Sequence, residues 1–161
     1  MLELDKIVSH SREGIKLMPT ERHQLIRSLF DEYIEMYASR DERLISHFSD
    51  NFSGYAGSSD VLITDRSEWI RITLQDFSQV PDRIDIEVVA LSLQDLSEDV
   101  IAVTAFFHIL LPTHEESLAK ETARLVLIFR NENISWKVHS GISIPYGLAK
   151  DNEIYPISSL E

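Results

Sequence analysis

The sequence predicts an α+β fold in which three N-terminal helices are followed by a curved antiparallel sheet. In the first half of the chain, apolar residues recur at three- and four-residue spacing, as they do on the buried face of an amphipathic helix. After Pro81 the pattern changes to the alternation that is typical of strands. Helices first and antiparallel strands afterwards are characteristic of one sheet wrapped around the helices.

The first half contains signals for the ends of each helix. Pro19 and Thr20 predict the start of the first helix, with Thr20 as its N-cap. Its apolar stripe comprises Leu25, Ile26, Leu29, Phe30, Tyr33, Ile34 and Tyr37. A shorter helix is predicted from about Asp41 to Phe48, and the polar segment NFSGYAGSSD predicts a strand edge and a loop. Thr64 or Asp65 should cap a third helix, which Pro81 ends.

The second half predicts successive strands. The apolar phase set by Ile84 and Ile86 slips by one residue near Val88 and Val89, which predicts a β-bulge and a bend in the sheet. The run from Val100 to Leu111 is apolar at both odd and even positions, which predicts cover on both faces. Residues 122–129 alternate again, residues 131–133 form a turn, and the last strand should end at Pro145.

Composition excludes several classes of protein. A chain of 161 residues with 43% hydrophobic content fits one domain. It has no cysteine, its six histidines lack metal-ligand spacing, and no glycine-rich phosphate loop is present, so we predict no metal and no cofactor. A net charge of −12 disfavours nucleic acid and anionic membranes as partners. The N-terminal residues do not resemble a signal peptide and no segment is apolar enough to span a bilayer, which predicts a cytoplasmic protein.

Two segments carry a family resemblance, NFSGYAGSSDVLITDRSEWIRITLQDFSQVP and ISIPYGLAKDNEIYPISSLE. They resemble the nuclear transport factor 2-like, polyketide-cyclase-like (SnoaL-like) superfamily of cystatin-like α+β cones. The resemblance is to a bacterial branch whose members often precede diguanylate cyclase or other signalling domains as sensor modules. It covers roughly residues 20–161 and implies a cone with a central pocket, formed by a domain at 20–145 between a leader at 1–19 and an extension at 146–161.

The resemblance also has a departure. The usual closing strand of the family carries two histidines two positions apart, whereas here His139 is followed by Gly141. A pocket that relied on both imidazoles would be incomplete.

Arg124 and His139 are the first candidate ligand-binding residues. Arg124 lies in a strand interior, where its permanent charge either clamps a carboxylate ligand inside the cone or pairs with an acid such as Glu121 or Asp85 on the solvent side. His139 falls where family members place an inward-facing histidine, and the alternative is a structural histidine bonded to a neighbouring strand.

Four further residues complete the candidate set. His108 could line the cone or lie in a subunit interface. Trp69 and Tyr55 could form the aromatic wall of the pocket mouth, although Trp69 also matches the core stripe of its helix. Tyr33, like Tyr37, lies on the buried stripe of the first helix, where some enzymes of the superfamily keep a tyrosine that donates to an oxyanion. Asp60 matches an acid typical of the sensor-like branch, and it could equally be a turn residue. No catalytic residue and no metal ligand is predicted.

We therefore expect a homodimeric, non-catalytic domain that binds a small organic molecule, anionic or polar at one end, as a stand-alone relative of sensor modules. The apolar strands predict that the dimer forms through the outer sheet face and hides Val126 and Ile128. The alternatives are a cofactor-independent isomerase, dehydratase or cyclase, and a protein-interaction scaffold. Strand interiors 100–111 and 122–129 contain no Asp or Glu, which disfavours the enzyme. A sensor should have a closed apolar pocket, an enzyme should add a buried acid, and a scaffold should have its cone filled.

Overall fold

The computed structural model describes residues 17–55, 61–112, 118–133, 135–150 and 153–154. In chain order its elements are α2 (Pro19–Ala38), the 3₁₀ helix η1 (Glu42–His47), β1 (Phe48–Tyr55), α3 (Arg66–Gln79), β2 (Asp85–Ser97), β3 (Val100–Pro112), β4 (Leu118–Glu132), β5 (Ser135–Lys150) and β6 (Glu153–Ile154). The predicted α+β class is confirmed. The predictions for most of the leader, for Asp60 and for the end of the tail lie outside the described residues.

The helix ends follow from local capping chemistry. Helix α2 begins at Pro19 after the N-cap Met18, so the prediction of Thr20 as N-cap was wrong. Proline is favoured at the first helical position because its fixed φ suits the helix and its missing N–H has no partner to lose there. At α3, Asp65 is the cap and accepts from the Ser67 N–H at 2.9 Å, as predicted. The expected second helix is the short 3₁₀ helix η1.

The sheet order is β1-β5-β4-β3-β2, with β6 paired to β5. Strands β2 to β5 pair antiparallel, and the register of β2 against β3 shifts between Val88 and Ala90. This shift confirms the predicted bulge. The sheet is not wholly antiparallel, however, because β1 pairs parallel with β5. The strand edge predicted in the segment NFSGYAGSSD is part of β1, but its parallel pairing was not predicted.

Strand β5 does not end at Pro145 as predicted. It continues to Lys150, and Pro145 lies opposite Ala123 at a register shift in the β4–β5 ladder. A proline lacks the N–H that the ladder needs, so it is tolerated in a strand mainly at an edge or a bulge. The bulge therefore allows the strand to pass through Pro145.

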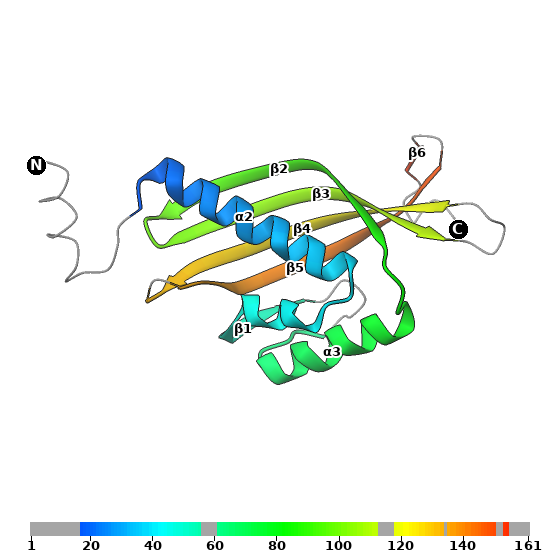
Figure 1. The fold of residues 1–161 in the computed structure, drawn as a ribbon, viewed down its shortest axis with the longest axis horizontal. Helices are drawn as coiled ribbons and strands as arrows, with labels where there is room; N and C mark the ends of the chain where they lie inside the picture. Colours follow the sequence, from blue (N-terminus) through cyan, green and yellow to red (C-terminus); the bar gives the residue numbers. More distant parts are fainter. Residues whose placement is uncertain (1–16, 56–60, 113–117, 134, 151–152, 155–161) are drawn as a thin grey trace, which may run out of the picture.

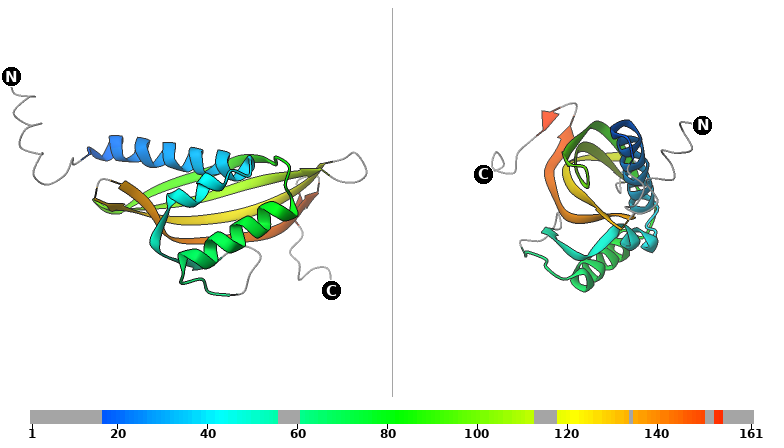
Figure 2. Two further views of the ribbon diagram at one scale, coloured as in Figure 1. Left: turned by 60° about the horizontal axis from the view of Figure 1, so that its bottom comes forward. Right: turned by 90° about the vertical axis from the view of Figure 1, so that its left-hand side faces the viewer.

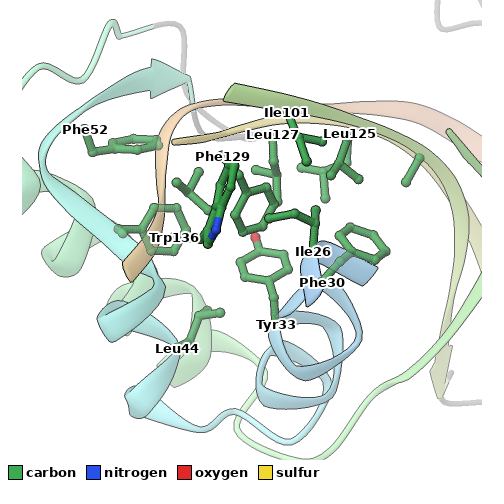
Figure 3. Close-up of a cluster of buried hydrophobic side chains, with 14 of the residues drawn as sticks. Ile26, Phe30, Tyr33, Leu44, Phe52, Ile101, Leu125, Leu127, Phe129 and Trp136 are labelled. Atoms are coloured by element: carbon green, nitrogen blue, oxygen red, sulfur yellow. The ribbon is translucent and has the colours of Figure 1, made fainter. Parts of the chain in front are cut away.

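The sheet is strongly curved, with α2 along its concave side and α3 beneath the β1 edge (Figures 1 and 2). Alternate residues of β3 and β4 point inward and are buried against α2 (Figure 3). Phe30 of α2, Phe52 of β1 and Phe129 of β4 are all fully buried, and each side chain contributes about 1.5–3 kcal/mol through its burial. Among the described helices, none is long and apolar enough to cross a membrane.

Candidate functional site

A small cavity of about 70 Å³ lies inside the cone between α2, η1, α3 and the strands β2 to β4. Its walls include four aromatic side chains, Tyr33, Tyr37, Trp69 and Phe107, together with aliphatic residues. The polar lining residues from α3 are Thr73 and Asp76. One water needs roughly 10–15 Å³ on this measure. The cavity therefore has room for about five waters or a short organic molecule.

Helix α3 brings Trp69, Thr73 and Asp76 onto one face, because residues four and seven positions apart lie one above another on a helix. Asp76 is half-buried, and burial raises the pKa of its carboxyl while the positive charge of Arg40 partly opposes that rise. Within the described part of the chain, no side chain forms a hydrogen bond or an ion pair with this carboxylate. Asp76 thus offers the cavity an acceptor that is open to a ligand.

The other polar groups of the cavity can donate hydrogen bonds. Burial raises the pKa of both the Tyr33 and the Tyr37 hydroxyl, so both stay protonated at neutral pH. Figure 3 shows the Tyr33 hydroxyl directed from α2 toward the sheet. The indole N–H of Trp69 is buried and has no hydrogen-bond partner among the described residues. A buried donor without a partner costs free energy.

Arg40 joins the ends of α2 and α3 beside the cavity. Its guanidinium carbon lies 5.0 Å from the Tyr37 ring centroid and 5.1 Å from that of Phe77. Its Nε donates to the Val80 carbonyl at 2.9 Å and its Nη1 to the Tyr37 carbonyl at 3.3 Å. Its backbone has φ 60, a left-handed value that is uncommon outside glycine. These contacts hold the Tyr37 ring in the cavity wall.

Residues 26–147 match the model of the SnoaL-like domain. The chain belongs to the SnoaL-like family. No curated protein shows significant sequence similarity to it.

Solved structures share the fold of this SnoaL-like domain. An NTF2-like protein of unknown function from Pseudomonas putida KT2440 is 12% identical with a TM-score of 0.72, over 88% of this chain and 98% of that one. A candidate dehydratase of the NTF2-like family from Streptomyces avermitilis is 16% identical with a TM-score of 0.67, over 79% and 98%. The association domain of C. elegans CaMKII is 10% identical with a TM-score of 0.67, over 78% and 96%. At these identities the similarity establishes the fold, which is the predicted cystatin-like cone.

Of the predicted site residues, Tyr33 and Trp69 line the cavity. Arg124 does not, because its side chain is exposed on the outer face of β4 while its neighbours Ala123 and Leu125 are buried inside. Strand alternation allows only one of the two parities to face the cone. The prediction that Arg124 points into the cavity was therefore wrong, and the alternative placement on the solvent side is correct.

Tyr55 and His108 also lie outside the cavity lining. Tyr55 is 40% exposed at the end of β1. His108 lies on the outer face of β3 beside Phe106, with a ring centroid distance of 5.5 Å. Its Nδ1 is 3.6 Å from a carboxylate oxygen of Glu87 on β2. Of the two alternatives for His108, the structure excludes a position in the cone.

His139 has a structural role at a shift in the register of β5. Its Nε2 bonds to the Glu132 carboxylate oxygen that also accepts from the Ser49 hydroxyl at 2.5 Å. The hydrogen bond from Ser49, followed by the contact with His139, lowers the pKa of Glu132. This cluster ties β1 to the β4–β5 hairpin and lies apart from the cavity lining.

Gly141 occupies the position where the resemblance implied a second histidine, and there is little room for a side chain there. A β-carbon there would lie 3.0 Å from Leu127 Cδ2 and 3.5 Å from Phe52 Cε2. The space beside this position in the SnoaL-like cone is therefore occupied by Phe52, which is fully buried.

Sequence reasoning missed Asp76. The signal that could have found it is its position seven residues after Trp69, on the same helical face as Thr73. An acid on an otherwise apolar stripe is a candidate functional residue. Within the described residues, no group of three or more histidines and acids is arranged to hold a metal ion.

Proposed function

We propose that this SnoaL-like domain binds a small organic molecule in the cavity between α2, α3 and the sheet. The observation that carries the proposal is the half-buried Asp76 carboxyl in a largely apolar wall. Desolvating a carboxylate costs free energy unless a partner offsets it. A ligand that hydrogen-bonds to Asp76 would supply that partner, and the buried N–H of Trp69 offers a second polar contact.

The structure changes the kind of polar group that we expect on the ligand. The sequence-based expectation of an anionic ligand depended on an inward-facing Arg124, and this residue is exposed on the outer face. The polar end of the ligand would instead meet Asp76, while its apolar part would contact Trp69 and the tyrosine rings.

Two isoleucines of α3 provide a matched test of the binding site. Ile72 lines the cavity, whereas Ile70 is also half-buried on α3 but does not. Thermal-shift screening of a small-molecule library should therefore find compounds that stabilise the native protein and Ile70→Phe but not Ile72→Phe. At a hundredfold excess over Kd the stabilisation should reach about 2.7 kcal/mol. Equal responses of both variants, or no response to any compound, would contradict binding in this cavity.

A second candidate function is proton-transfer catalysis. Burial raises the pKa of Asp76, and a raised carboxyl pKa suits a general base or acid. The protonated hydroxyls of Tyr33 and Tyr37 could donate to a developing oxyanion. With each compound found in the screen, NMR should detect turnover or deuterium exchange at carbon, and Asp76→Asn should abolish it without abolishing binding. Binding without either reaction would favour the non-catalytic function.

We also propose that the outer sheet face pairs with a second copy of the chain. Phe106, Val126 and Ile128 are half-buried apolar side chains on this face. Asp85 and Glu87 of β2 and Arg124 of β4 are exposed on the same face. In a two-fold symmetric contact, acids of one copy can meet the arginine of the other.

Sedimentation equilibrium tests this pairing. Val126→Glu would introduce a charge at the centre of the face and should give a monomer. Gln24→Glu, which adds the same charge at an exposed position of α2, should leave the dimer unchanged. A native protein that is monomeric at micromolar concentration would refute the pairing.

A further inference from the structure

The cavity walls combine aromatic rings with one carboxylate. Tyr33 and Tyr37 come from α2, Trp69 from α3 and Phe107 from β3. The face of an aromatic ring carries partial negative charge and attracts organic cations, most strongly in the case of tryptophan. A group of such rings around one space is typical of sites that recognise ammonium groups.

Asp76 gives the same space a full negative charge. Among the described residues that line the cavity, none is a lysine, an arginine or a histidine. The positive charge of Arg40 acts on Asp76, but the Arg40 guanidinium donates to the carbonyls of Val80 and Tyr37. It lies over the rings of Tyr37 and Phe77 and is not a lining residue. The cavity therefore provides negative charge without a cation of its own.

The charge of the whole chain acts in the same direction. A net charge of −12 raises the local concentration of cationic ligands and lowers that of anionic ones.

We propose that the ligand of this cavity is a small organic ammonium ion, with its charged group at Asp76 and within reach of the surrounding aromatic rings, which also contact its alkyl part. This inference rests on the proposed small-molecule function and names its ligand class. The volume of about 70 Å³ favours a ligand with a short alkyl chain, since an engineered apolar cavity that binds benzene has roughly twice this volume, about 150 Å³.

Three compounds with one carbon skeleton separate charge from shape. Isobutylamine is a cation at pH 7, isobutanol is neutral, and isobutyrate is an anion. We expect ligand-observed NMR titrations of the full chain to give at least tenfold tighter binding of isobutylamine than of either analogue. Asp76→Asn should remove this preference. Asp82→Asn, which makes the same charge change at an exposed position after α3, should retain it, and the thermal melting of each variant would confirm that it folds.

The outcomes distinguish the two levels of the proposal. If isobutanol binds as well as isobutylamine, and Asp76→Asn binds both, the cavity binds small molecules but the ammonium inference is overturned. The same holds if none of the three binds while other library compounds do. If none of them binds and the library is also silent, both the inference and the proposed function are overturned. Preference for the amine that persists in Asp76→Asn would also overturn the inference.

Discussion

Replacing Gly54 with alanine tests how closely β1 must approach β5. A β-carbon at Gly54 would lie 2.2 Å from the Gly141 carbonyl oxygen and 3.0 Å from its nitrogen. Because these are backbone atoms, the strands must separate, and the paired hydrogen bonds of Gly54 with Ile63, both 2.9 Å, should weaken. Because the added atom meets backbone at 2.2 Å, the overpacking should cost about 3 kcal/mol or more, the upper end of the usual range, and the reduced entropy of the unfolded chain returns about 0.4–1 kcal/mol. We expect a net loss of about 2–3 kcal/mol.

Gly141→Ala is the matched control, since it adds the same methyl group on the paired strand. There the nearest atom is Leu127 Cδ2 at 3.0 Å, the end of a flexible side chain, so the change should stay within about 1 kcal/mol. In a chain of this length the Gly54 variant should melt roughly 4–12 °C lower, with a matching shift in urea midpoint at constant m. A Gly54→Ala protein as stable as the native one, or a larger loss for Gly141→Ala, would refute the close-approach argument.

Three further changes probe the core and the ion pairs. Phe30→Ala should lower the unfolding free energy by about 3–5 kcal/mol, because Phe30 is fully buried, and urea denaturation that finds less than 1 kcal/mol would contradict the packing. Arg22 lowers the pKa of Asp95, so this ion pair stabilises the fold above the unfolded carboxyl pKa, and its contribution is lost as pH falls through the lower folded pKa. The melting temperature of Asp95→Asn should therefore decline less steeply in acid than that of the native protein. An unchanged decline would exclude the pair as its source. Glu132→Gln replaces the acceptor shared by Ser49 and His139. Amide hydrogen exchange in β1 should then become faster than in β3. Equal protection of the two strands would argue against a link between β1 and the β4–β5 hairpin through Glu132.

The parts of the fold that could be predicted have regular sequence signals. The three- and four-residue spacing along α2 and the cap at Asp65 depend on contacts within one helix, so they are visible in sequence. The slip at Val88–Val89 was visible because it changes which residues face the core, and the register of β2 against β3 confirms it. The parallel pairing of β1 was missed because it depends on a distant segment, where Gly54 meets Gly141. Such a contact leaves no periodicity in either sequence.

The site could be predicted only in part, for a related reason. Tyr33 and Trp69 lie on helical stripes, where periodicity indicates the buried face, and both line the cavity. For Arg124 the parity of the strand had to be chosen, and the buried Ala123 and Leu125 show that the other parity faces inward. The shift in β5 changes the parity near His139, so counting along the strand could not place this imidazole.

The position of the cavity follows from how the two ends of the cone are filled. At the β1 end, the rings of Phe48 and Phe52 lie 5.2 Å and 4.6 Å from the Trp69 ring, and Gly141 leaves the room that Phe52 needs. Because aromatic side chains occupy this part of the interior, the closing strand has no space there for a second imidazole. The open volume lies on the other side of Trp69, where α3 supplies Asp76. We therefore expect the polar contacts of a ligand to come from helix α3. A site placed on the closing strand, as the family resemblance implied, would lie in the end of the cone that aromatic side chains fill.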